Sequence, residues 1–155
     1  MDATKSIIDS TAKISLVVQI ITGLVGIRGL RMTVDRWHEP LKDVLRMETI
    51  VQFIELAFYI WLIFRLTTLD NDLIASTRYI DWAITTPIML LSTVLYMRYS
   101  EGLVSGNIDM LEELSWSSFW NNEKESLVKI VIYNALMLVF GYLGETGALP
   151  KMLSI

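Results

Sequence analysis

The stretch RYIDWAITTP, residues 78–87, places an arginine and an aspartate inside an apolar run that extends from about residue 77 to residue 97. A run of about 20 apolar residues is long enough to cross the hydrocarbon core of a bilayer as a helix. An ionisable side chain inside such a helix costs about 3 kcal/mol or more unless it has a partner. Arg78 and Asp81 therefore indicate a functional site inside a membrane.

The whole chain has the composition of an integral membrane protein. Of its 155 residues 53% are apolar and only 19% are charged, and the mean hydropathy is +0.47. Soluble domains usually carry about 25% charged residues. Four runs are long enough to span a bilayer, at about residues 12–30, 47–66, 77–97 and 127–149. The sequence predicts one all-α transmembrane domain over residues 1–155.

The distribution of positive charge predicts the orientation in the membrane. The first and third connections, about residues 31–46 and 98–126, together with the helix ends beside them carry eight of the 13 lysines and arginines. Cytoplasmic connections are enriched in these residues. We therefore expect both connections in the cytoplasm and the amino terminus outside. The third connection mixes acidic with aromatic residues, which indicates an amphipathic element at the membrane surface.

Polar side chains of the third predicted helix share one face. At about 100° per residue, Asp81, Thr85 and Ser92 point in nearly the same direction, and Arg78 lies one turn away on that face. This places a proton acceptor and two hydroxyls along one interior line. The alternative is structural, because threonine and serine in membrane helices often bond the carbonyl four residues earlier, and Pro87 frees such a carbonyl.

A second polar stripe lies on the second predicted helix. Its members are Glu48, Gln52, Glu55 and Tyr59, spaced by four, three and four residues. Two acids inside a membrane are too costly to face lipid, so the stripe is expected to line water or an ion path. In the alternative interpretation, Glu48 lies among the headgroups beside Arg46 or Lys42, and Glu55 is a protonated structural acid.

Other classes of site are not indicated. The chain has no cysteine and a single histidine, His38, so no metal site is expected. No nucleophile paired with a base and no glycine-rich phosphate loop is present, so no enzyme activity is expected. No basic cluster alternates with aromatic residues, so nucleic acid is not an expected partner.

Three segments resemble the microbial rhodopsins. Residues 78–87 resemble their third helix, and residues 138–147, LVFGYLGETG, look like the fourth helix of proteorhodopsins. Residues 57–65 are similar to the second helix, although Ile60 stands where those pumps have histidine. The resemblance implies that the four helices correspond to helices A to D of a seven-helix protein, and that the cofactor is all-trans retinal.

The resemblance also implies roles for individual residues. Asp81 would be the counterion of the protonated retinal Schiff base and its first proton acceptor. Thr85 would bond Asp81, and Arg78 would gate the outward path. The residues implied to lie against retinal are Tyr79, Trp82, Thr86, Met89 and Gly144.

Two features of the sequence bear on which type of rhodopsin it resembles. Outward proton pumps of the family usually have a carboxylic acid where Ser92 stands, and serine cannot return a proton efficiently. Ser15, Gln52 and Glu55, taken with the set on the third helix, are similar to the channel-forming viral rhodopsins. We therefore expect a light-gated cation channel, with a slow outward proton pump or a photosensor as alternatives. The expected partners are the bilayer, retinal and cations or protons, with a homo-oligomer as a further option.

The Schiff-base lysine is missing from the sequence. The family carries it deep in the seventh helix, whereas every lysine here lies at or beyond a predicted helix end. Lys129, at the start of the fourth predicted helix, is the only one near a span. We expect that the chain comprises the first four helices of a seven-helix rhodopsin and cannot bind retinal covalently by itself. A true four-helix protein is the alternative.

Overall fold

The computed structural model describes residues 3–65 and 71–147, which form four long helices and two short ones. The helices are α1 (Ala3–Leu30), η1 (Arg36–His38), α2 (Glu39–Arg65), α3 (Asn71–Ser105), α4 (Ile108–Glu113) and α5 (Trp116–Glu145). The described residues include no strand. The predicted all-α fold is therefore confirmed.

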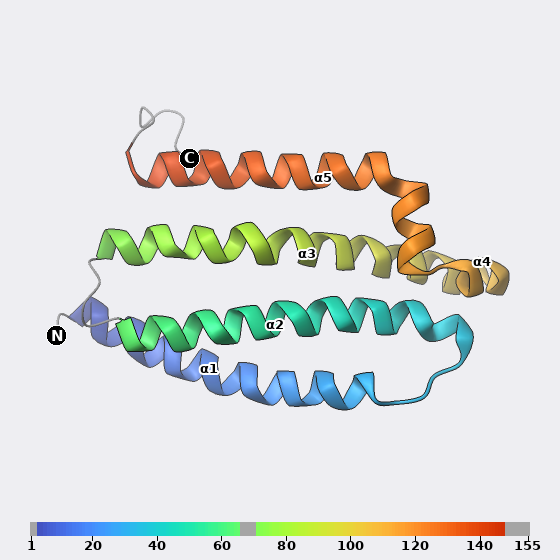
Figure 1. The fold of residues 1–155 in the computed structure, drawn as a ribbon, viewed down its shortest axis with the longest axis horizontal. Helices are drawn as coiled ribbons and strands as arrows, with labels where there is room; N and C mark the ends of the chain where they lie inside the picture. The colour runs from blue at the N-terminus through green and yellow to red at the C-terminus, as the bar shows by residue number, and fades with distance from the viewer. Residues whose placement is uncertain (1–2, 66–70, 148–155) are drawn as a thin grey trace.

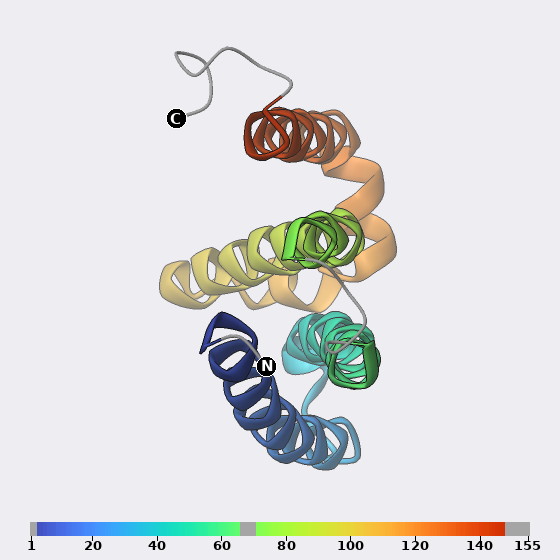
Figure 2. The same cartoon turned by 90° about the vertical axis from the view of Figure 1, so that its left-hand side faces the viewer.

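The long helices lie side by side with α1 against α2, α2 against α3, and α3 against α5 (Figure 1). Turned by 90°, the same view places α1 and α5 at opposite ends of this row (Figure 2). Four segments are long and apolar enough to cross a membrane: Lys5–Leu30, Arg36–Arg65, Ser76–Ser105 and Trp116–Glu145. Many large apolar side chains on them point outward, among them Leu24, Phe64 and Met137. Such helices suit a lipid surrounding.

Three glycines bring α1 close to α2. Gly23, Gly26 and Gly29 are spaced by three residues, and a side chain at either of the last two would crowd α2. A Cβ atom on Gly26 would lie 3.0 Å from the hydroxyl oxygen of Thr49, and one on Gly29 would lie 2.8 Å from a methyl of Leu45. Small residues permit such close packing between membrane helices.

The predicted helix boundaries are wrong at the end of the bundle that carries α4, called the α4 end below. There α2 begins at Glu39, α3 continues to Ser105 and α5 begins at Trp116, so the predicted connections 31–46 and 98–126 are largely helical. Hydropathy detects only the apolar part of a helix, and these helices continue into polar sequence. Pro40 does not interrupt α2, because a first turn has no intrahelical partner for its N–H groups. The predicted ends at residues 66 and 149 lie outside the described residues.

Capping residues and a small core organise the α4 end. Asn107 caps α4 through the backbone N–H of Met110, and Ser115 forms a capping box with Ser118 at the start of α5. The core there consists of Leu95, Phe119 and Leu127, with Trp116 and Trp120 packed against it. The aromatic residues of the predicted amphipathic element thus join α5 to α3.

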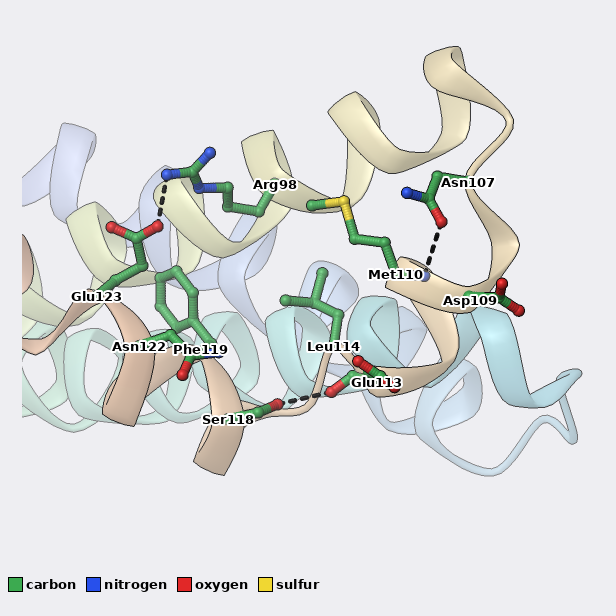
Figure 3. A pocket seen from close by; sticks show the side chains of 10 residues that line it. All are labelled: Arg98, Asn107, Asp109, Met110, Glu113, Leu114, Ser118, Phe119, Asn122 and Glu123. Atoms are coloured by element: carbon green, nitrogen blue, oxygen red, sulfur yellow. Dashed lines mark hydrogen bonds and ion pairs between the residues drawn. The ribbon is translucent and has the colours of Figure 1, made fainter.

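An arginine of α3 pairs with an acid of α5 at the same end. Arg98 forms ion pairs with Glu101, at 3.0 Å, and with Glu123 of α5, at 2.5 Å. Figure 3 shows Arg98 and Glu123 on the wall of a cavity of about 510 Å³ between α3, α4 and α5. The pair of Arg98 with Glu123 thus joins α3 to α5 beside this cavity.

Candidate functional site

The polar face of α3 is buried against the neighbouring helices. The exposed fractions of Asp81, Thr85 and Ser92 are 9%, 1% and 0%. All three residues belong to the continuous helix α3, which contains Pro87 between the second and the third. The aspartate therefore lies inside the row of helices rather than on the surface that suits lipid.

Asp81 has one oxygen atom without a partner. Its Oδ1 is buried and accepts no hydrogen bond within the part of the chain that the structure describes. Thr85 does bond Asp81, but its hydroxyl donates to the backbone carbonyl, at 3.0 Å, and not to the carboxylate. This is the local bond that the structural alternative predicts. The Asp81 carboxylate thus keeps acceptor capacity for another group.

Ser92 meets an acid from α2. Its hydroxyl hydrogen-bonds the Glu48 side chain and also contacts the backbone carbonyl of Met89, at 2.9 Å. A hydroxyl has a single proton, so it shares that proton between two acceptors or receives one from a protonated Glu48. Neither Arg46 nor Lys42 forms the ion pair with Glu48 that the alternative interpretation predicts. Those cations pair with Asp43 and Glu39 instead.

The second acid of α2 faces α1. The amide nitrogen of Gln19 donates to Glu55 at 3.1 Å, and Gln19 is only 8% exposed. Gln19 was not among the predicted site residues, although a single amide inside the apolar run of α1 is the same kind of signal that identified Asp81.

The other two predicted residues of this group lie along the same interface. Ser15 is half-buried and stands one helical turn before Gln19. Gln52 faces α1, because a Cβ atom on Gly23 would lie 3.8 Å from its side-chain oxygen. The polar stripe of α2 therefore points at α1 and α3.

Arg78 marks the opposite end of the polar face of α3. Its guanidinium pairs with Glu145 of α5 at 3.4 Å and lies 5.7 Å from the centre of the Trp82 ring. Tyr79 stacks edge-on with Trp82, with 5.3 Å between ring centroids, and with Tyr142 of α5, at 5.5 Å. Glu145 was not among the predicted site residues, although it belongs to the stretch 138–147.

A buried asparagine connects α5 to α3. Asn134 is 5% exposed and donates to the Thr86 hydroxyl at 2.9 Å, while Thr86 donates to the backbone carbonyl of Trp82 at 2.5 Å. Asn134 was also missed, although it is a lone amide among apolar residues. A cavity of about 550 Å³ lies beside it, lined in part by Met89 and Tyr133. Gly144 is half-buried on the same helix.

Lys129 lies inside α5 and not at its start. The helix begins at Trp116, and Lys129 pairs with Glu125 one turn earlier, at 2.7 Å. Its side chain is 60% exposed. The predicted position of this lysine at a helix end is therefore wrong, because the helix extends well before the apolar run.

Comparisons with known proteins agree with this architecture. A family model described as bacteriorhodopsin-like protein matches residues 10–154. Among solved structures, the chain is similar to the crystal structure of viral rhodopsin OLPVRII, with a TM-score of 0.78 and 26% sequence identity over 96% of the chain. The chain spans 62% of the length of that viral rhodopsin. No curated protein sequence matches it.

Proposed function

Because the chain belongs to the bacteriorhodopsin-like protein family, we propose that it forms part of a retinal-binding photoreceptor that conducts cations through the membrane in light. It is an integral, multi-pass membrane protein with four apolar helices. In the proposed orientation the amino terminus is extracellular and the α4 end is cytoplasmic. The polar face of α3 then leads from Arg78, near the outer surface, toward the cytoplasm.

The surroundings of Asp81 fit a protonated retinal Schiff base. A buried carboxylate is costly unless a cation or hydrogen bonds compensate it, and Oδ1 of Asp81 has no partner among the described residues. When bound, retinal supplies a light-driven change of shape next to a cationic nitrogen. Asp81 balances that charge and accepts its proton, while Tyr79 and Trp82 restrict water at this level of α3.

The lysine that holds retinal is not Lys129 in this proposal. The contacts of Thr86 with Asn134 and of Tyr79 with Gly141 set the register of α3 against α5. In that register Asp81 lies level with about residue 139, so Lys129 is displaced by about 15 Å along the helix axis. We propose that the Schiff-base lysine comes from outside residues 1–155.

The observation that supports a channel is the direction in which the acidic stripe on α2 points. Glu55 bonds Gln19 of α1, and Glu48 bonds Ser92 of α3, so both acids are held between helices. The two residues are separated by seven positions, or about 10 Å of helix. Carboxylates along such a line attract cations and repel anions. This arrangement supports a cation path between α1, α2 and α3.

Neutralising Glu55 is expected to change which cations pass. In the complete protein with retinal, Glu55→Gln should change the permeability ratio of Na⁺ to a larger cation by about tenfold, because one charge at 4 Å contributes up to about 4 kcal/mol at an effective dielectric of 20. The measurement is the reversal potential of the photocurrent under voltage clamp. The matched control is Glu125→Gln, an acid whose side chain is 86% exposed on α5. Equal reversal potentials in both variants would show that the acidic stripe does not line the ion path.

A slow outward proton pump is the second candidate, and the contact between Glu48 and Ser92 favours it. Glu48 supplies a carboxylic acid at the position where Ser92 by itself cannot donate a proton. In a pump, Glu48→Gln should slow the return of the proton to retinal by about 10²-fold, while Ser92→Ala should slow it less because the acid remains. Flash spectroscopy measures both rates. A photocurrent that stays outward at every voltage identifies the pump, and one that reverses identifies the channel.

A further inference from the structure

A histidine and a tyrosine join the first connection to α3. Nδ1 of His38 and the Tyr99 hydroxyl are 2.6 Å apart. Tyr99 is 4% exposed, and His38 is half-buried beneath Trp37, with 3.6 Å between the two ring centroids. His38 is the single histidine of the chain, and the ion-path residues named above do not include it or Tyr99. The pair thus remains without an assigned role.

Tyr99 continues the polar face of α3. It lies seven residues after Ser92, which lies seven residues after Thr85, and a step of seven residues returns to the same face within about 20°. The step from Ser92 to Tyr99 covers about 10 Å of helix axis. Ser92 meets Glu48, and Tyr99 meets His38, so the partners follow each other in the same direction. The face that begins at Asp81 therefore leads to the pair of His38 and Tyr99.

The pair is suited to close this path. A cation moving from Glu48 toward the α4 end meets two hydrogen-bonded rings there, and neither ring provides a carboxylate in place of the ion's water. His38 belongs to η1, a three-residue turn packed against α2 and α4. Such a short element has few contacts of its own, so it can open without unfolding a long helix.

We propose that the hydrogen bond between His38 and Tyr99 is the gate of the polar path at the α4 end, closed in the dark and opened in light. This inference rests on the proposed function, in which the path between α1, α2 and α3 carries cations. It assigns the gate to two residues at the α4 end of the bundle, about 27 Å along α3 from Asp81. The gate is thus separate from the retinal site.

The test measures access to Ser92 from the side of the membrane that exposes α4. The complete protein carries Ser92→Cys as a reporter, and residues 1–155 contain no other cysteine. A cationic, membrane-impermeant methanethiosulfonate is applied to that side, and the rate of modification is measured in the dark and in light. The same protein without the reporter gives the background rate.

Tyr99→Phe removes only the hydroxyl and keeps the ring. We expect it to raise the rate of cysteine modification in the dark at least about tenfold. The rate should approach the one measured in light for the Ser92→Cys protein in which His38 and Tyr99 are intact. The control is Tyr96→Phe, which removes a hydroxyl from a half-exposed tyrosine one turn earlier on α3. His38→Phe removes the other partner and gives a second test if Tyr99→Phe fails to fold, as judged by its visible absorption band.

The outcomes separate the gate from the channel. A rise in the dark modification rate of Tyr99→Phe or His38→Phe that is absent from Tyr96→Phe supports the gate. This holds even if the photocurrent does not reverse, in which case the gated path carries protons. Dark rates in both gate variants equal to that of Tyr96→Phe would overturn the gate, and a reversing photocurrent would then leave the channel itself intact.

Discussion

Asp81→Asn is expected to move the visible absorption band of the complete, retinal-loaded protein to longer wavelength. The carboxylate stabilises the positive charge of the Schiff base, so its loss narrows the energy gap of the chromophore. The same substitution should slow proton transfer from the chromophore by about 10²-fold or more, because amide oxygen is a poor proton acceptor. An absorption spectrum in detergent and a flash experiment measure the two effects.

The control for this prediction is an acid at the same end of the bundle. Glu145→Gln removes a charge that pairs with Arg78, whose guanidinium lies over Trp82, but its own carboxylate is bound at the surface. It should shift the band much less than Asp81→Asn. If the band of Asp81→Asn stays in place, Asp81 is not the counterion, and another acid must balance the Schiff base.

Leu111→Ala is expected to lower the free energy of unfolding by about 2–5 kcal/mol. Leu111 is 1% exposed and packs α4 onto α3. It lies directly over Gly102, since a Cβ atom on that glycine would be 2.6 Å from one of its methyl groups. Unfolding in mixed detergent micelles, followed by circular dichroism, measures the change.

The contact between Gly102 and Leu111 predicts a coupling between two substitutions. Gly102→Ala alone should cost about 1–3 kcal/mol from crowding, reduced by about 1 kcal/mol because alanine favours the helix. In the double variant, Gly102→Ala with Leu111→Ala, the crowding disappears. Its loss of unfolding free energy should therefore be smaller than the sum of the two single losses. Gly23→Ala is the control, because its Cβ atom would lie at an ordinary 3.8 Å from the side-chain oxygen of Gln52. Strictly additive costs would show that the two residues do not press on each other.

The sequence by itself determined the all-α membrane fold, the rhodopsin family and the buried face of α3. Hydrophobic length is a local property, and so is the spacing that places Asp81, Thr85 and Ser92 on one face. The motif at residues 78–87 is local as well. The helix ends were not determined, because the segments before Met47 and after Met97 are helical without being apolar. Their helical state depends on caps such as Asn107 and on contacts between helices.

Only the tertiary structure decided which polar residues meet. Periodicity fixes the face of a helix, but it does not fix how far one helix is shifted along the next. That register follows from close packing, as at Gly26 against Thr49 and at Gly102 against Leu111. It brings Glu48 to Ser92 and His38 to Tyr99, residues that are 44 and 61 positions apart in the chain. These contacts depend on side chains from two segments, so no single segment could reveal them.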